Sequence, residues 1–207
     1  MTRAVISDFG GVLTTPLLRG FVAYQQESGL SPEELGKAMA RATEAYGEHP
    51  LFELERGRIT EAEFGRRLGT YLDGGLDLGR LREVYFEHLH PNERMIDYLR
   101  ELRARGLRTA LLTNNVREWE PLWRAKLPEI DEVFEVVVDS AFVGMRKPER
   151  GIYELTLERL GGLEASDCVM VDDIDVNCQA ARDLGMRVVL FKDTDQAIAE
   201  LERLLRP

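Results

Sequence analysis

Three aspartates and one lysine, far apart along the chain, are the side chains best suited to chemistry. Asp8 follows a short apolar segment near the start of the sequence, and Asp172 and Asp173 follow another one late in the sequence. Lys147 precedes Pro148, which is predicted to be the first residue of a helix because proline is favoured at that position. A cation at a helix N-terminus opposes the helix dipole, so we expect an anion to lie beside Lys147.

The apolar segments before these residues are typical of the strands of a parallel sheet. They are short, rich in β-branched residues and nearly continuous in apolar character, as in strands that helices cover on both faces. Five segments fit this description, namely residues 3–7, 107–112, 134–138, 168–171 and 187–191. Ligands of open α/β sheets bind beyond the carboxyl ends of the strands, and we therefore expect the three aspartates and Lys147 to meet at that edge.

Carboxylates packed at one edge of a sheet repel each other unless a cation or a proton lies between them. Mg²⁺ meets this need because it binds one or two carboxylates together with water and phosphate oxygens. Lys147, Thr113 and the backbone N–H groups of a helix expected to begin near Asn114 would bind the anion, and the predicted ligand is a phosphate. Taken singly, these residues have ordinary interpretations as strand ends or helix caps, and only their joint arrangement favours a site.

Four short stretches of the sequence, in this order and at this spacing, resemble the four motifs of the haloacid dehalogenase-like hydrolase superfamily. They are Asp8-Phe9-Gly10-Gly11-Val12, Leu112-Thr113-Asn114, Lys147-Pro148 and Asp172-Asp173. The resemblance covers essentially the whole chain. A narrower similarity, to the group that contains the N-terminal phosphatase domain of soluble epoxide hydrolase and bacterial sugar-phosphate phosphatases, is carried by residues 53–59, 143–149 and 171–177.

The resemblance implies a fold and a role for each motif residue. The fold is α/β, with a Rossmann-like parallel sheet core in three α/β/α layers and a helical cap inserted after the first strand. Asp8 would be the nucleophile that receives a phosphoryl group and also a ligand of Mg²⁺. The backbone carbonyl of Gly10, the carboxylate of Asp173 and, directly or through water, Asp172 would complete the metal site. The phosphoryl oxygens would be held by Thr113, Asn114 and Lys147.

Gly10 departs from the pattern of most phosphatases of the superfamily, which carry a second aspartate two residues after the nucleophile. That aspartate is the general acid and base, a contribution typically worth about 10²- to 10⁴-fold in rate. We hypothesise that an enzyme with Gly10 is slower and prefers leaving groups that need little protonation. Two other functions stay open. One is a module that binds a phosphorylated ligand or protein without turning it over. The other is a metal-independent hydrolase of carbon–halogen bonds, against which the doubled carboxylates Asp172 and Asp173 weigh.

Between residues 16 and 91 the pattern changes from strands to helices. Apolar residues recur at helical spacing in residues 32–46, 60–72 and 78–88. This pattern predicts a helical cap at residues 16–91, inserted into a Rossmann-like core made of residues 1–15 and 92–207. Because a cap covers the leaving group, we expect it to select the substrate. The predicted substrate contacts in its loop before the helix near Thr60 are Glu53 and Arg56.

Composition limits the possible partners. The chain of 207 residues has 27 Lys and Arg against 37 Asp and Glu, and this net charge of −10 argues against nucleic-acid binding and favours a small phosphorylated metabolite. No apolar run approaches the roughly 20 residues of a membrane span. Cys168 and Cys178 have no C-x-x-C spacing, so a cytoplasmic protein without membrane association is predicted. The sequence does not indicate an oligomeric state.

Overall fold

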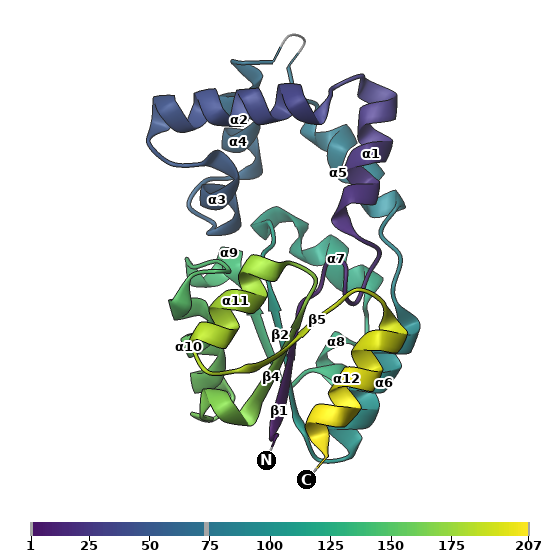
Figure 1. Ribbon diagram of the computed structural model, residues 1–207. Coiled ribbons are helices and arrows are strands. Elements are labelled where there is room, and N and C mark those ends of the chain that lie inside the picture. Colours follow the sequence, from purple (N-terminus) through teal and green to yellow (C-terminus); the bar gives the residue numbers. More distant parts are fainter. Residues whose placement is uncertain (1, 73–74, 207) are drawn as a thin grey trace.

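A parallel sheet forms the centre of the computed structural model, which describes residues 2–72 and 75–206 (Figure 1). Its strands are β1 (Ala4–Ser7), β2 (Arg108–Thr113), β3 (Val136–Asp139), β4 (Cys168–Asp172) and β5 (Arg187–Leu190). They pair in parallel in the order β3-β2-β1-β4-β5. The predicted α/β fold is confirmed. Each strand begins and ends within two residues of the predicted positions. The predicted core and cap ranges also include residues 1, 73, 74 and 207, which lie outside the described residues.

Successive residues of a strand point to opposite faces of the sheet, and in these strands the residues on both faces are apolar. Helices therefore cover both faces. Val5 packs in one apolar cluster with Leu99 and Leu201, whereas the next residue, Ile6, packs in another with Ile152. The first face is covered by α6 (Glu93–Ala104), α7 (Glu120–Lys126), α8 (Ile130–Val133) and α12 (Thr194–Leu205). The second face is covered by α10 (Arg150–Arg159) and α11 (Asp175–Asp183). The core therefore has the three α/β/α layers that the resemblance implies.

The turn before α10 corrects the prediction that Pro148 is the first residue of that helix. The helix begins at Arg150, and the N–H of Glu149 donates to the carbonyl of Arg146 at 2.8 Å. This hydrogen bond closes a turn that contains Lys147 and Pro148, and the helix starts only after it. Lys147 is therefore not at a helix N-terminus, and its charge must be balanced by other means.

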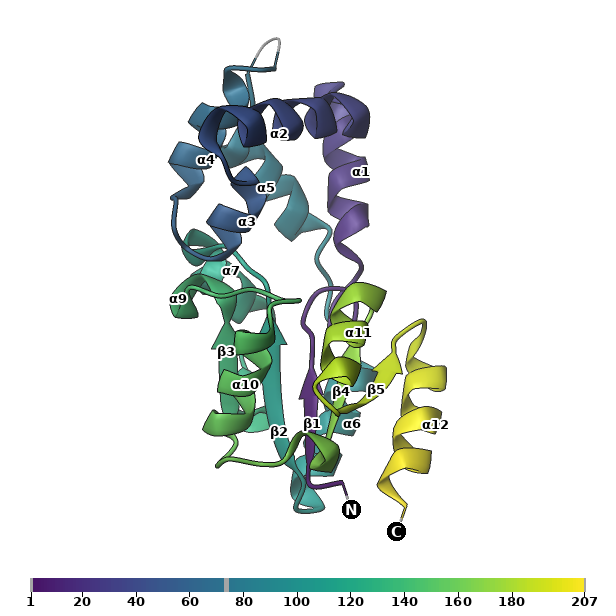
Figure 2. The same cartoon turned by 60° about the vertical axis from the view of Figure 1, so that its left-hand side comes forward.

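A helical cap follows β1 and lies over the carboxyl edge of the sheet (Figures 1 and 2). It consists of α1 (Leu17–Ser28), α2 (Pro32–Tyr46), α3 (Pro50–Glu55), α4 (Glu61–Gly69) and α5 (Leu78–Glu87). The predicted helices correspond to α2, α4 and α5, whereas α1 and α3 were not predicted. A capping box fixes the start of α2, since Ser31 Oγ accepts from the N–H of Glu34 and the Glu34 carboxylate accepts from the N–H of Ser31. None of the described helices combines the length and the apolar character that a membrane crossing needs.

Two chain segments join the cap to the core and lie side by side. The N–H of Thr15 donates to the carbonyl of His90 at 2.9 Å, and the N–H of Asn92 donates to the carbonyl of Leu13 at 2.8 Å. On the other side of the molecule, α3 lies above α9 (Ser140–Val143), the short helix that follows β3 (Figure 1). The cap thus meets the core both at its connecting segments and along α3. Its division from the core after residues 15 and 91 stays a prediction.

Candidate active site

Asp8, Asp172 and Asp173 meet at the carboxyl edge of the sheet, as the sequence predicts. Asp8 follows β1, Asp172 is the last residue of the neighbouring strand β4, and Asp173 comes directly after it. One carboxylate oxygen from each aspartate lies within 4.8 Å of the other two. Asp172 is fully buried and Asp8 is only 6% exposed, so water screens their repulsion poorly.

Lys147 lies between two of these carboxylates. Its Nζ is 2.7 Å from Asp8 Oδ1 and 2.7 Å from Asp172 Oδ2, and its side chain is almost completely buried. Burial lowers the pKa of Lys147, but the two carboxylate charges and their hydrogen bonds outweigh this effect, and the net shift is upward. The lysine is therefore charged, and the anions that balance it in this structure are Asp8 and Asp172.

The carboxylates of Asp8 and Asp173 are less well compensated than the lysine. Burial raises the pKa of Asp8 to about 7, an effect that Lys147 opposes and Asp172 reinforces. Burial likewise raises the pKa of Asp173, and the charge of Asp172 adds to it. Three carboxylates against one ammonium group leave an excess of negative charge, which favours a divalent cation at this position.

Asp173 provides the observation that tests the fit of a metal. Its Oδ1 is buried and has no hydrogen-bond partner among the described residues. The carboxylate also lies close against Gly11, where a Cβ would be 2.2 Å from Asp173 Oδ2 and where φ is +83°. Glycine is required at that position on both grounds. A hard cation such as Mg²⁺ would satisfy the unpartnered oxygen, so the residues present fit the ion.

Asp172 is bound more completely than the other two aspartates. Its Oδ2 accepts from Lys147, and its Oδ1 accepts from the N–H of Ile174 at 2.9 Å and from Asn177 Nδ2 at 3.1 Å. These partners fix the carboxylate in one orientation and commit both of its oxygens. Asp172 is thus well placed to hold Lys147, and its predicted contact with the metal, direct or through water, stays a prediction.

The segment after β2 differs in part from the prediction. Residues 114–116 form a loop, followed by the 3₁₀ helix η1 (Arg117–Trp119) and then by α7. The expectation of a helix beginning near Asn114 is therefore wrong. The reason is that neighbouring side chains bind the N–H groups of this loop: Ser140 Oγ accepts from Asn115 at 3.0 Å, and Asn115 Oδ1 accepts from Val116 at 2.9 Å. The N–H groups of Asn115 and Val116 are thus already hydrogen-bonded in this structure.

Thr113 and Asn114 nevertheless lie at the same edge of the sheet. Thr113 is the buried last residue of β2. The Asn114 side chain binds the main chain of Lys147 at both ends: its Nδ2 donates to the Lys147 carbonyl at 3.0 Å, and its Oδ1 accepts from the Lys147 N–H at 2.8 Å. Asn114 therefore positions the lysine, and its direct contact with phosphoryl oxygens stays a prediction.

Gly10 has room for a side chain. A Cβ built on Gly10 would have no atom within 4 Å. Packing therefore does not require glycine at this position, in contrast to the neighbouring Gly11.

The two predicted substrate contacts in the cap are both engaged in ion pairs. Glu53 Oε2 lies 2.9 Å from Arg67 Nη1, within the cap. Arg56 lies 2.5 Å from Glu149 in the core and 3.0 Å from Glu48 in the cap. Neither interaction involves the aspartates, and substrate contact by Glu53 or Arg56 stays a prediction.

Two cap residues near the site were not identified from the sequence. Tyr85, on α5, is 9% exposed. Burial raises the pKa of its phenol, and the charge of Asp8 raises it further, so the phenol lies within electrostatic reach of that carboxylate. Burial also raises the pKa of Glu55, at the end of α3, while Arg146 and, more weakly, Lys147 oppose the shift. Tyr85 has no signal in the sequence because residues 78–88 have an ordinary helical pattern of apolar residues. Glu55 lies within residues 53–59, which carry the narrower resemblance, but was not predicted as a site residue.

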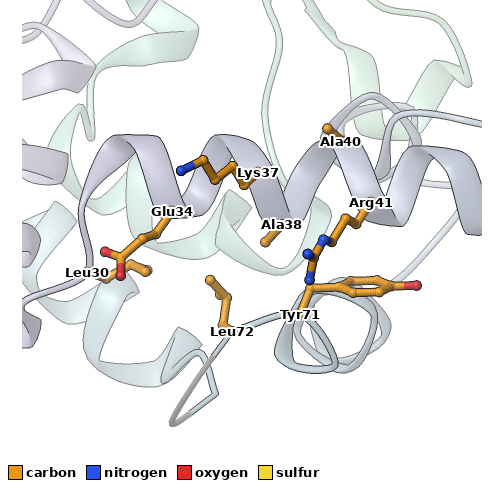
Figure 3. Close-up of a pocket in the computed structure, with 8 residues that line it drawn as sticks. All are labelled: Leu30, Glu34, Lys37, Ala38, Ala40, Arg41, Tyr71 and Leu72. Atoms are coloured by element: carbon orange, nitrogen blue, oxygen red, sulfur yellow. The ribbon is translucent and has the colours of Figure 1, made fainter.

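A separate hollow lies on the cap (Figure 3), and none of the three aspartates lines it. Its volume is about 380 Å³. It is lined by Leu30, Glu34, Lys37, Ala38, Ala40, Arg41, Tyr71 and Leu72. These residues come from α2 and the segments next to it, and none belongs to the four motifs.

The fold and this site define a class: a capped, Rossmann-like protein with an acidic metal site and a buried lysine at the carboxyl edge of its sheet. A family model described as haloacid dehalogenase-like hydrolase matches residues 2–185. The chain belongs to that family, and it is an enzyme of the hydrolase type.

Known relatives agree with this assignment. The chain is 36% identical over 98% of its length to bifunctional epoxide hydrolase 2 of Sus scrofa, of which the match spans 38%. It is 28% identical over 93% of its length to phosphatase MT3486 of Mycobacterium tuberculosis, of which the match spans 88%. The HAD family enzyme bt-2542 of Bacteroides thetaiotaomicron, solved in complex with magnesium and inorganic phosphate, superposes with a TM-score of 0.72 at 21% identity, with all of both chains covered. The chain spans well under half the length of several of its curated relatives, at 38% of the rat epoxide hydrolase 2.

Proposed function

We propose that the chain is a Mg²⁺-dependent phosphatase that transfers the phosphoryl group of a small phosphorylated metabolite to Asp8. One observation carries this proposal: Lys147 Nζ bridges Asp8 and Asp172 at 2.7 Å each, beside an unpartnered Asp173 oxygen within the same cluster. A phosphate monoester needs a nucleophile, a fixed cation and a divalent ion, and this edge of the sheet offers all three roles. The phosphatases among the relatives support the same reaction.

The reaction would proceed by two displacements at phosphorus. In the first, a carboxylate oxygen of Asp8 forms a bond to phosphorus while the bond from phosphorus to the leaving-group oxygen breaks, and that oxygen keeps the electron pair. In the second, a water oxygen bonds to phosphorus, the bond to Asp8 breaks, and the water proton passes to solvent. Lys147 would neutralise negative charge on the phosphoryl oxygens in both steps, and Thr113 would donate a hydrogen bond to one of them. A bound Mg²⁺ would supply further charge neutralisation, held by Asp8, Asp173 and the Gly10 carbonyl.

Gly10 bears on which substrates react well. With glycine at that position, no side chain two residues after Asp8 can protonate the departing oxygen. The leaving group would then have to take its proton from water, or depart as a stable anion. We therefore assign to this chain a preference for leaving groups of low pKa, such as an anomeric sugar hydroxyl, a carboxylate or a phenol.

A phosphate-release assay with and without Mg²⁺, over a panel of phosphorylated metabolites, tests the proposal. Release that depends on Mg²⁺ and stops on addition of EDTA is the expected result. Gly10 favours one rival, a binding module without turnover, for which inorganic phosphate and Mg²⁺ would bind while no substrate is hydrolysed. Halide release from 2-haloacids without a metal would instead identify a dehalogenase.

A further inference from the structure

The segment that carries Lys147 is irregular, and side chains from elsewhere fix its position. It lies between α9, which ends at Val143, and α10, which begins at Arg150. From the core, the Asn114 amide holds the Lys147 main chain through two hydrogen bonds, at 2.8 and 3.0 Å. Also from the core, Asp8 and Asp172 bind the Lys147 side chain, and Met145 packs against the apolar cluster of Ile152. The residues on either side of Lys147, Arg146 and Glu149, are bound by side chains of the cap.

Glu55 of the cap binds the residue just before Lys147. The Nε of Arg146 donates to Glu55 Oε2 at 2.5 Å, and the two side chains are only 15% and 16% exposed. The Arg146 guanidinium also lies 4.0 Å from the centre of the Phe52 ring, one turn earlier on α3. This arginine is therefore enclosed by the last turns of α3, through a charge pair and a cation–π contact.

Arg56 of the cap binds the residue two positions after Lys147. Its Nη2 lies 2.5 Å from Glu149 Oε1, and its Nε donates to the same oxygen at 2.7 Å. The Arg56 side chain is 15% exposed, and Glu48 holds its other edge at 3.0 Å. In the first pair the cap contributes the acidic residue, Glu55, and in the second pair it contributes the basic residue, Arg56. A shifted register of α3 would bring like charges together, so only one docked position satisfies both pairs.

We infer that Glu55 and Arg56 are positioning residues that couple docking of the cap to the placement of Lys147 between Asp8 and Asp172. When α3 is docked, it holds both ends of the turn in which the lysine lies. When α3 leaves, only contacts within the core restrain Lys147, namely those of Asn114 with its main chain and of Asp8 and Asp172 with its side chain. The inference rests on the proposed function only in naming a phosphoryl group as the ligand of Lys147. Because a reacting or binding group displaced by about 1 Å can lose much of its effect, this coupling makes tight anion binding depend on a closed cap.

The chain contains a matched control for this inference. Glu53 lies on α3 two residues before Glu55, and its pair with Arg67 is of the same burial, 16% and 14% exposed, but lies wholly within the cap. Glu53→Gln therefore removes an equally buried carboxylate charge from the same helix without touching the Lys147 segment. Glu55→Gln and Arg56→Gln each remove one of the two ion pairs between the cap and the residues that flank Lys147.

Hydrogen exchange of the Lys147 and Glu149 amides, in protein without Mg²⁺ or phosphate, is the first measurement. Both N–H groups are hydrogen-bonded in the closed structure, to Asn114 Oδ1 and to the Arg146 carbonyl. Glu55→Gln and Arg56→Gln are expected to speed their exchange by about three- to thirtyfold, and Glu53→Gln to leave it unchanged. Equal exchange in Glu55→Gln and Glu53→Gln would overturn the inference. This readout needs no turnover, so it stands even if no phosphatase activity is found.

The second measurement is the affinity for inorganic phosphate at saturating Mg²⁺, determined by calorimetry. Phosphate would reach Lys147 but carries no leaving group for the cap to recognise. A loss of affinity of about three- to thirtyfold in Glu55→Gln and Arg56→Gln, but not in Glu53→Gln, is expected. Unchanged phosphate affinity together with a raised KM for esters would mean that Arg56 contacts the leaving group instead, and would overturn the inference.

A double variant, Glu55→Gln with Arg146→Gln, keeps the test valid if the single change unfolds the protein. It leaves no unpaired buried charge behind, so the fold should tolerate it better. Positioning is still lost, and fast exchange at Lys147 is again expected. Wild-type exchange in this double variant would count against the inference.

Discussion

The carboxyl edge of the sheet and the cap hold their charged side chains in different ways. At the edge of the sheet, Asp8 and Asp172 end adjacent parallel strands, so the pairing of β1 with β4 sets their separation. In the cap, Glu55 and Arg56 are placed by a short helix, and their partners lie 91 and 93 residues away in the sequence. In the proposed mechanism, the reacting carboxylate is thus placed by paired strands, whereas the cap is joined to the lysine segment by side-chain ion pairs. Ion pairs of this kind would let a cap separate from the core to admit a substrate.

Removing the Asp8 carboxylate tests the first half of this comparison and should have the largest effect. Asp8→Asn keeps the shape of the side chain but removes the nucleophile, so phosphate release should fall by about 10⁴-fold or more. The measurement is kcat on the best substrate of the panel. Asp97→Asn, at an exposed position on α6, is the control and should keep the full rate. Wild-type turnover by Asp8→Asn would remove Asp8 from the mechanism.

Placing a carboxylate at Gly10 tests whether the edge of the sheet lacks a general acid for the leaving group. The open space around Gly10 should accommodate Gly10→Asp. If a general acid is what the site lacks, kcat/KM should rise by about 10²-fold for esters of poorly acidic alcohols and little for aryl phosphates. The measurement is the dependence of rate on leaving-group pKa. The matched control is Gly36→Asp on α2, where a Cβ also has no atom within 4 Å. The same dependence in Gly10→Asp and wild type would refute the interpretation.

The sequence predicts the edge of the sheet more completely than it predicts the cap. The edge of the sheet could be predicted because Asp8, Thr113 and Asp172 lie at or directly after the ends of strands of recognisable pattern, and parallel strands end at one edge. Asp173 was predicted in this way, whereas the role of Gly10 came only from the family resemblance. The turn at Pro148 could not be predicted, since a main-chain hydrogen bond between Glu149 and Arg146 and a long-range contact from Asn114 override the preference of proline for a helix start.

Several elements and contacts of the cap could not be predicted from the sequence. α3 has six residues, too few for an apolar period to be recognised, and α1 has no side-chain N-cap. The functional meaning of Glu55 lies in a partner far along the chain, and local pattern carries no such information. Glu53 and Arg56 could be singled out as charged residues before the helix near Thr60, but Glu53 lies on α3 and not in the predicted loop. Only the structure distinguishes the pair of Glu53 within the cap from the pair of Arg56 that bridges to the core.

Asp173→Asn should weaken Mg²⁺ binding by about 10- to 100-fold, because it removes the negative charge of a carboxylate that has a buried oxygen without a hydrogen-bond partner among the described residues. Calorimetric titration with Mg²⁺ in the absence of substrate measures this directly. Asp175→Asn, two residues later and largely exposed, is the matched control and should bind Mg²⁺ normally. Equal affinity in the two variants would exclude Asp173 as a ligand.

The smallest expected effect concerns Asp139, where sheet and cap meet. Its Oδ1 accepts from the N–H of Ala141 at 3.0 Å and so caps α9, while its Oδ2 is buried without a hydrogen-bond partner among the described residues. The Ala141 carbonyl in turn lies so close to Gly57 of the cap that a Cβ there would be 2.1 Å away. Burial raises the pKa of Asp139 from 3.8 to about 6.

Between about pH 4 and pH 6, the folded protein therefore binds the Asp139 proton more tightly than the unfolded chain does. The contribution of this group to the free energy of unfolding is greatest at low pH, falls as the pH rises through that window, and stays low above it. Asp139→Asn, which can still cap α9, should gain about 1–2 kcal/mol relative to wild type between pH 4 and pH 7. Denaturant unfolding of both proteins across this range measures the difference. If the free energies of unfolding of the two proteins change in parallel with pH, Asp139 does not titrate between pH 4 and pH 7.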